Sequence, residues 1–290
     1  MENKKSYLML ISAMLIYGTI GIFRKFIPIS SASLAFVRGL IGALCLFIYI
    51  KITGRNFRQK IGGRNIFLLA VTGGLIGINW IFLFESYNYT SVAVSTLCYY
   101  MEPTIVILIS PFFFKEKLTG RKLICAACAI IGMIFVSGIL EQRTVAGGGY
   151  KGVLLGLAAA VIYAMVIVLN KKIHVEDAYI KTMIQLLSAS LIILPYVLFA
   201  EDLGSIELNA FAIVMILLVG VLHTGVAYAL YFGSMEGLKA QTIAILSYID
   251  PVAALILAAL ILKEKMTLYG IIGAVLIIGA AVISELKKDK

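Results

Sequence analysis

Two acidic residues stand inside long apolar segments, and each is followed directly by a proline. Glu102 precedes Pro103, and Asp250 precedes Pro251 at a point 148 residues further along the chain. A carboxyl group in apolar surroundings is costly, and it commonly marks a site that binds a substrate or handles a proton. Each proline also removes a backbone donor and loosens the helix beside the acid. These two acids are therefore the first candidates for function.

The surroundings of the acids indicate a membrane. Of the 290 residues, 61% are hydrophobic and 14% are charged, whereas soluble domains carry roughly 25% charged residues. So large an apolar excess cannot be hidden in a water-soluble core, and the bilayer is the expected solvent. The net charge of +10 could suggest nucleic acid, but the charges cluster in short gaps between apolar runs. Membrane topology explains that pattern more simply, so we expect no nucleic-acid partner.

Ten segments are long and apolar enough to cross the membrane as helices, since about 20 apolar residues span its hydrocarbon core. They lie at about 6–26, 32–50, 66–87, 91–114, 121–139, 152–170, 179–199, 210–233, 240–262 and 267–285. The connections are short, so we expect one membrane domain. The first segment is too long for a signal peptide and lacks a small-x-small cleavage site, so we expect it to be retained.

The positions of Lys and Arg predict which way the spans face. With the N-terminus inside, the inner segments carry 18 of these residues and the outer segments carry six, while Arg38 lies within a span. Positive residues accumulate on the cytoplasmic side of membrane proteins. We therefore expect an integral, multi-pass cell membrane protein with both termini in the cytoplasm.

The chain contains an internal repeat. The offset of 148 residues that relates the two acids also relates Tyr100 to Tyr248 and the Lys-Glu-Lys triplets at 115–117 and 263–265. Each copy holds five spans, an odd number, so the second copy enters the membrane from the opposite side. The predicted fold is an all-α membrane protein with ten transmembrane helices in two inverted five-helix repeats, residues 1–140 and 150–286.

The depth of the two acids suggests a shared site. Each is about the eleventh residue of its span, roughly 16 Å deep at 1.5 Å per residue, and so near the midplane. An ionisable group there costs at least about 2.5–3.5 kcal/mol unless it meets water or a partner. A common internal cavity would give both Glu102 and Asp250 access to water or to a partner, and so lower this cost. A purely structural role, with each acid protonated or bonded to a hydroxyl, stays open.

Several segments resemble the EamA type of the drug/metabolite transporter superfamily. They are AMLIYGTIGIFRK and its counterpart AAVIYAMVIVLNK, LAFVRGLIGAL, and above all YMEPTIVILISPFFFKEKLTGRK and YIDPVAALILAALILKEKMTLYG. The resemblance covers nearly the whole chain as two tandem copies. It implies a ten-helix carrier with a central cavity lined mainly by spans 1, 3, 4, 6, 8 and 9, and many members export amino acids or other small metabolites. It does not identify a substrate.

Aromatic residues extend the candidate site beyond the acids. Trp80 and Phe84 share one face of span 3 at helical spacing, and Tyr228 is the counterpart of Trp80 in the second copy. Near the starts of the two copies the offset drifts by one or two, so Tyr17 and Tyr163 are repeat mates in spans 1 and 6, and Gln185 is the mate of Arg38. Aromatic stripes usually reflect packing or an interfacial belt, and that alternative remains beside cavity lining.

The residues just before each acid divide by helical face. Tyr99 and Ser247 precede their acids by three positions and share their faces, whereas Tyr100 and Tyr248 precede them by two and are expected to point elsewhere. The predicted substrate-binding set is Tyr17, Trp80, Phe84, Tyr99, Glu102, Tyr163, Tyr228, Ser247 and Asp250.

Other polar residues within the spans have structural interpretations. Arg38 can tie down carbonyl groups between helices, and this anchoring is favoured over substrate contact. His223 is expected to be a hydrogen-bonded core histidine, with a proton relay as the alternative. Cys125 and Cys128 form a CxxC without a second ligand pair, so we expect neither a metal nor a cofactor.

The sequence predicts a secondary transporter and not an enzyme. It would move a small polar metabolite by alternating access around a midplane cavity, with protons as a further candidate partner. Aromatic faces and two carboxyl groups favour an amino acid or organic amine, carried outward. Two alternatives are a flippase for lipid-linked substrates in the same superfamily and an intramembrane aspartyl-type enzyme. The motifs GxGD, HExxH and GxSxG are absent, which disfavours the enzyme.

The predicted topology can be checked by cysteine labelling in intact cells. A cysteine at Asn56 should be shielded from an impermeant thiol reagent and one at Gly148 labelled, because five basic residues between Lys51 and Arg64 hold that segment inside. The parent protein, whose four cysteines all lie in apolar runs, measures the background. The reverse labelling pattern would contradict the orientation.

Overall fold

The structure, a computed structural model, describes residues 4–55, 61–114, 119–136, 149–202, 209–235, 237–238, 242–243 and 246–285. Regular secondary structure in these residues is entirely helical, as expected. The elements are α1 (Lys4–Gly18), α2 (Ile20–Lys25), α3 (Ser31–Ile52), α4 (Gly63–Tyr89), α5 (Val92–Tyr99), α6 (Glu102–Phe114), α7 (Gly120–Val136), α8 (Gly149–Asn170), α9 (Ala178–Ala200), α10 (Ala210–Leu218), the π-helix η3 (Val219–Val226), α11 (Ala227–Met235), α13 (Ile249–Ile261) and α14 (Leu268–Glu285).

Seven helical segments of the described chain are long and apolar enough to cross a bilayer. They are Lys4–Lys25, Ser31–Ile52, Gly63–Tyr89, Val92–Phe113, Tyr150–Asn170, Ala178–Ala200 and Ala210–Met235, and each coincides with a predicted span. The three remaining predictions correspond to the shorter helices α7, α13 and α14. The predicted spans at 121–139 and 240–262, like the first Lys-Glu-Lys triplet, include residues outside the described part of the chain. These findings support a multi-pass membrane protein.

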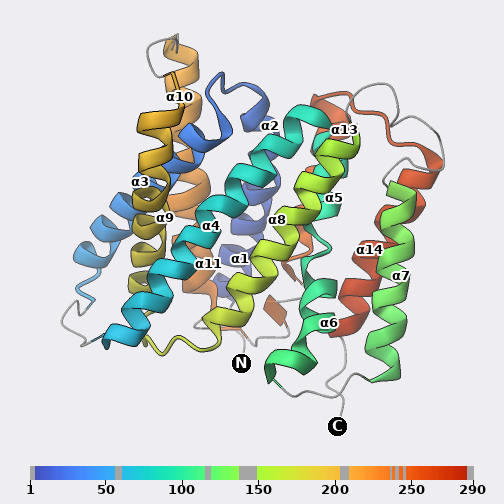
Figure 1. The fold of residues 1–290 in the computed structure, drawn as a ribbon, viewed down its shortest axis with the longest axis horizontal. Helices are drawn as coiled ribbons and strands as arrows, with labels where there is room; N and C mark the ends of the chain where they lie inside the picture. Colours follow the sequence, from blue (N-terminus) through green and yellow to red (C-terminus); the bar gives the residue numbers. More distant parts are fainter. Residues whose placement is uncertain are drawn as a thin grey trace.

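The helices run alternately between the two ends of the bundle (Figure 1). α1 starts at the lower end in this view, α3 returns to it, α4 rises again, and α14 finishes at the lower end (Figure 1). α8, which opens the second half of the chain, starts at the upper end (Figure 1). The first and second halves therefore enter the bundle from opposite ends.

Contacts between the halves form matching pairs. α4 packs on α8, and α11 packs on α1; α4 also packs on α9, and η3 on α3. α3 packs on α9 and α7 on α14. The counterparts in the two halves are α1 and α8, α3 and α9, α4 and the α10–η3–α11 segment, and α7 and α14. Exchanging each element for its counterpart reproduces this set of contacts. The elements α3, α4, α8 and α9 thus join the halves through their mutual contacts.

The GxxxG sequence at the start of α8 permits a close approach to the first half. A Cβ at Gly152 would lie 2.7 Å from Cγ2 of Thr90, and one at Gly156 would lie 2.8 Å from Cβ of Cys98. Real Cβ atoms do not come so close, so both positions require glycine for this packing. The close approach holds α8 against α5, whose C-terminal end leads to Glu102.

Polar contacts tie α3 to α9 at one end of the bundle. The hydroxyl groups of Ser30 and Ser33, at the start of α3, both donate to the carboxylate of Glu201, which follows α9. A second carboxylate, that of Glu264, also joins the two halves of the chain. Glu264 accepts hydrogen bonds from the backbone N–H groups of Val92 and Ala93 at 2.9 and 3.1 Å, and so caps α5.

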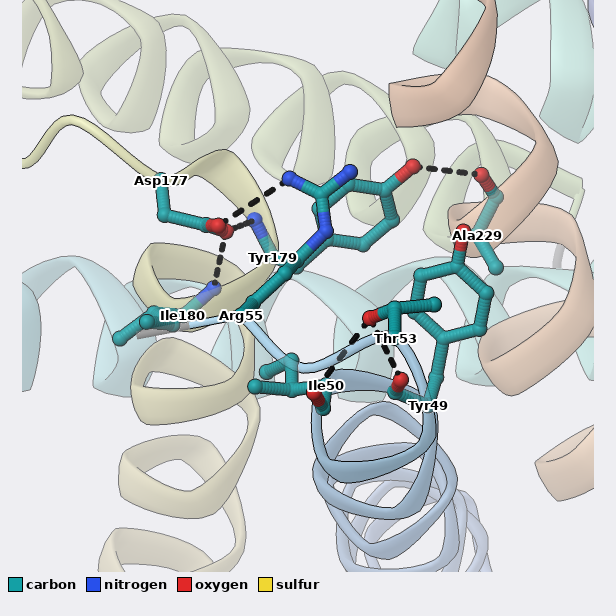
Figure 2. Close-up of polar contacts among 8 residues, drawn as sticks. All are labelled: Tyr49, Ile50, Thr53, Arg55, Asp177, Tyr179, Ile180 and Ala229. Atoms are coloured by element: carbon teal, nitrogen blue, oxygen red, sulfur yellow. Dashed lines mark hydrogen bonds and ion pairs between the residues drawn. The ribbon is translucent and has the colours of Figure 1, made fainter. Parts of the chain in front are cut away.

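The other end of the same helix pair carries an ion pair, which Figure 2 shows. Nη1 of Arg55, just after α3, lies 3.1 Å from Oδ2 of Asp177. Asp177 caps α9 by accepting from the N–H groups of Tyr179 and Ile180 at 2.8 and 3.1 Å. The guanidinium lies 4.2 Å from the ring centroid of Tyr179, whose hydroxyl donates to the Ala229 carbonyl of α11. This Arg55–Asp177 clamp therefore connects three spans.

The two functions of Asp177 can be separated by substitution. Asp177→Ala removes the helix cap and the ion pair, and should lower the stability of the purified protein by about 1–2 kcal/mol. Asp177→Asn keeps the cap and loses only a partly exposed ion pair, and should cost about 0.2–1 kcal/mol. Unfolding in detergent measures both. The exposed Glu176→Ala is the matched control, and an Asn variant as unstable as the Ala variant would contradict this division.

Candidate functional site

The helix of the fourth predicted span is broken directly before its acid. α5 ends at Tyr99 and α6 begins at Glu102, with a turn between them. The N–H of Met101 bonds to the carbonyl three residues back, on Cys98, at 3.1 Å. Pro103 has no N–H to continue the helical pattern, which explains the break. Glu102 consequently occupies the first turn of a new helix, where the helix dipole favours a carboxylate.

The second half repeats this break. α13 begins at Ile249, and the N–H of Asp250 bonds to the Ser247 carbonyl three residues back at 3.2 Å. Pro251 removes the next backbone donor, so Asp250 also lies in the first turn of a helix. Interrupted helices inside membrane proteins are tolerated where the irregular backbone is buried in protein or lines a cavity, and carriers place binding sites at such interruptions.

A direct hydrogen bond joins the two breaks. The hydroxyl of Tyr100 donates to Oδ2 of Asp250 at 2.6 Å, and the rings of Tyr100 and Tyr248 lie 6.3 Å apart between centroids. The expectation that Tyr100 points elsewhere was wrong. It was based on one continuous helix, whereas the helix breaks at this residue and the partner acid belongs to the other half. The repeat itself was the signal that could have revealed the pair.

Tyrosines surround the two acids. The ring centroids of Tyr99 and Tyr163 lie 5.6 Å apart, and those of Tyr17 and Tyr228 lie 5.7 Å apart. Tyr99 and Tyr163 both lie near Glu102 and Asp250, and Tyr163 also lies near Tyr228. Six of the nine predicted site residues are thus brought into one cluster, which we call the tyrosine–acid cluster: Tyr17, Tyr99, Glu102, Tyr163, Tyr228 and Asp250.

Ser247 has a local bond within its own helix. Its hydroxyl donates to the Ile243 carbonyl at 2.8 Å, one turn back. Serine commonly returns its hydrogen bond to the preceding turn in this way, which satisfies the hydroxyl without a second helix. Its predicted part in substrate binding stays a prediction.

Trp80 and Phe84 are buried beneath Arg38. Their side chains are 5% and 0% exposed, and the guanidinium carbon of Arg38 lies 4.1 and 5.5 Å from their ring centroids. Nε of Arg38 donates to the Thr224 hydroxyl in η3 at 2.8 Å. The structure places a cation of the protein against these aromatic rings, and their predicted part in substrate binding stays a prediction. Arg38 does anchor two spans, although it does so through a hydroxyl and not a carbonyl.

His223 lies on the π-helix η3 beside Thr224. It is fully buried, with Nε2 2.7 Å from the Thr19 hydroxyl and Nδ1 3.4 Å from the Leu218 carbonyl. The prediction of a hydrogen-bonded core histidine is confirmed. In the described residues no group of three His, Cys, Asp or Glu side chains is placed to hold a metal ion. The polar residues that sequence analysis missed in this region are Tyr100 and Thr224.

In the described residues, a bundle of apolar helices with two interruptions beside half-buried acids defines a multi-pass membrane protein. The model of the EamA-like transporter family matches residues 4–138 and again residues 150–285. The chain therefore belongs to the EamA-like transporter family, and the predicted resemblance is confirmed.

Individual relatives agree with this assignment. The chain is 27% identical to the uncharacterized transporter YxxF of Bacillus subtilis over 99% of this chain and 92% of that protein. It is 29% identical to a protein of Escherichia coli named as a probable amino-acid metabolite efflux pump, over 68% of each chain. One solved crystal structure matches with a TM-score of 0.67 at 21% identity, over 97% of this chain and 96% of that chain. That likeness concerns the fold alone.

The bond between the two helix breaks leads to a stability prediction. Tyr100→Phe removes only the hydroxyl that Asp250 accepts from, and should lower the stability of the purified protein by about 1–3 kcal/mol. Thermal unfolding in detergent measures this loss. Tyr196→Phe, which changes an exposed tyrosine on the outer surface of α9, is the control. Equal unfolding temperatures for the two variants would contradict a stabilising role for the Tyr100–Asp250 bond.

Proposed function

We propose that the protein is a secondary transporter that exports a small polar metabolite, an amino acid or organic amine, by alternating access. The observation that carries this proposal is the hydrogen bond between Tyr100 and Asp250, which joins two interrupted helices from different halves. A site built from both halves changes its accessibility when the halves move relative to one another. Family membership supports transport, and the relatives named as transporters favour a carrier over an enzyme.

The proposed architecture is ten transmembrane helices in two inverted repeats, residues 1–140 and 150–286. Three observations support it: the family model matches twice, the halves start at opposite ends of the bundle, and the contacts between helices come in matching pairs (Figure 1). The excess of Lys and Arg at the inner segments favours both termini in the cytoplasm. The bilayer is the expected surrounding of the exposed apolar side chains.

The chemistry of the tyrosine–acid cluster supports the substrate class. Two carboxyl groups and the faces of several tyrosines attract an ammonium group, and each good cation–π contact contributes on the order of 0.5–2 kcal/mol. The relative named as a probable amino-acid metabolite efflux pump favours the same class. The carboxyl groups of Glu102 and Asp250 are the groups that could carry protons through the transport cycle.

An uptake screen over amino acids and amines in proteoliposomes tests the proposal. At least one such compound should be transported, faster with an imposed pH gradient. Asp250→Asn and Glu102→Gln should lose the response to the gradient and keep substrate exchange, because an amide cannot take up and release the proton. Glu176→Gln, which alters an exposed acid, should behave as the parent. If both site variants still follow the gradient, these acids do not couple protons; if no amine or amino acid is transported, the substrate class is wrong.

A further inference from the structure

Arg38 is a buried cation without a carboxylate partner in the described part of the chain. Its side chain is 5% exposed, and its one hydrogen bond to described residues runs from Nε to Thr224. The ion pair found between described residues, Arg55 with Asp177, does not involve Arg38. Nη1 and Nη2 of Arg38 have no acceptor among the described residues. Taking a cation out of water without a counter-charge is strongly unfavourable, so this arrangement calls for an anionic partner.

The repeat mate of Arg38 shows what a purely structural residue needs at this position. Gln185 is 3% exposed, and its amide nitrogen donates to the Thr72 hydroxyl at 2.7 Å and to Oδ1 of Asn170 at 2.9 Å. It ties α9 to α4 through a threonine, as Arg38 ties α3 to η3. A neutral amide is sufficient for this tie. The charge and the two remaining donor groups of Arg38 are therefore available for another purpose.

The surroundings of Arg38 connect it to the tyrosine–acid cluster. The guanidinium lies near Tyr228, Tyr17 and Tyr99, and Tyr99 in turn lies near both acids. The hydroxyl of Tyr17 is buried and has no hydrogen-bond partner among the described residues. The donors of Arg38 and Tyr17 that lack a partner among the described residues therefore lie near a cluster that also holds two carboxyl groups. An amino acid, with a carboxylate and an ammonium group, has the matching distribution of charge.

We propose that Arg38 binds the carboxylate of an amino-acid substrate through Nη1 and Nη2, with the Tyr17 hydroxyl as a further donor. The planar guanidinium suits a carboxylate because two parallel N–H groups can meet its two oxygens. Trp80, stacked at 4.1 Å, and Thr224 at Nε hold the plane in position. This inference rests on the proposed function and narrows its substrate class from amines in general to amino acids.

The fluorescence of Trp80 offers a direct test, because it is the single tryptophan of the sequence and lies against Arg38. The purified full-length protein is titrated with the proteinogenic amino acids other than Tyr and Trp, with their decarboxylated amines, and with their deaminated acids. Amino acids and deaminated acids should change the emission, and amines should not. Arg38→Gln should weaken carboxylate binding at least roughly tenfold, as expected when a charged hydrogen-bond donor is lost.

Two further variants guard against a fold defect in Arg38→Gln. Arg38→Lys keeps the charge without the planar fork and should give intermediate affinity. Tyr17→Phe removes one donor and should weaken the binding of carboxylates, seen as a higher concentration needed for the same change in emission. Thermal unfolding in detergent establishes that each variant is folded.

The possible outcomes separate this inference from the proposed function. Amino-acid binding that is unchanged in Arg38→Gln and Arg38→Lys overturns the role of Arg38 and leaves an amino-acid or amine carrier intact. Equal changes of Trp80 emission with amines and with amino acids also overturn the role of Arg38 and leave the proposed carrier intact. Binding of deaminated acids alone, lost in Arg38→Gln, supports Arg38 as a carboxylate site and overturns the amine-directed substrate class. A parent protein that responds to no carboxylate at all overturns the inference.

Discussion

The hydrocarbon core of a bilayer offers no donor or acceptor, so every polar group that enters it must find its partner within the protein. For the backbone this means helices, which satisfy their hydrogen bonds internally. For side chains it means pairs contributed by different helices, and these pairs determine which helices are neighbours. They are Arg38 with Thr224, Gln185 with Thr72, Thr19 with His223, the Asn79 amide with the Ala159 carbonyl, and Tyr100 with Asp250.

The same constraint gives the bundle two kinds of contact between its halves. The α3–α9 pair is tied at one end by Glu201 and at the other by the Arg55–Asp177 clamp (Figure 2). At the centre, the halves meet through interrupted helices in which backbone hydrogen bonds are already missing. The α3–α9 pair is thus held at both ends by carboxylates, whereas the breaks beside Glu102 and Asp250 meet through the Tyr100–Asp250 bond.

The acidic groups and the buried cation of the bundle lie at different places, and these places matter for the proposed substrate selectivity. The acids stand at the N-terminal ends of α6 and α13, where the helix dipole favours them. The one cation that stacks on Trp80 belongs to the chain itself. Since that face is already occupied, the remaining aromatic surface near the acids is that of tyrosines, whose hydroxyl groups can also bond to polar guests. In the proposed transporter, we expect this environment to favour a small molecule with both charges over a purely apolar one.

The sequence by itself determined the membrane class, most of the spans, the repeat and the family, because apolar run length and residue spacing are properties of the chain alone. It also indicated a loosened helix beside each acid, since a proline acts on its own helix, but it treated both spans as continuous, and the structure showed the breaks. Only the tertiary structure decided that Tyr100 meets Asp250 and that Arg38, not a guest, covers Trp80. Those contacts join residues 150 and 42 positions apart. Helical periodicity assigns a side chain to a face of its own helix, whereas its partner is set by how separate helices pack.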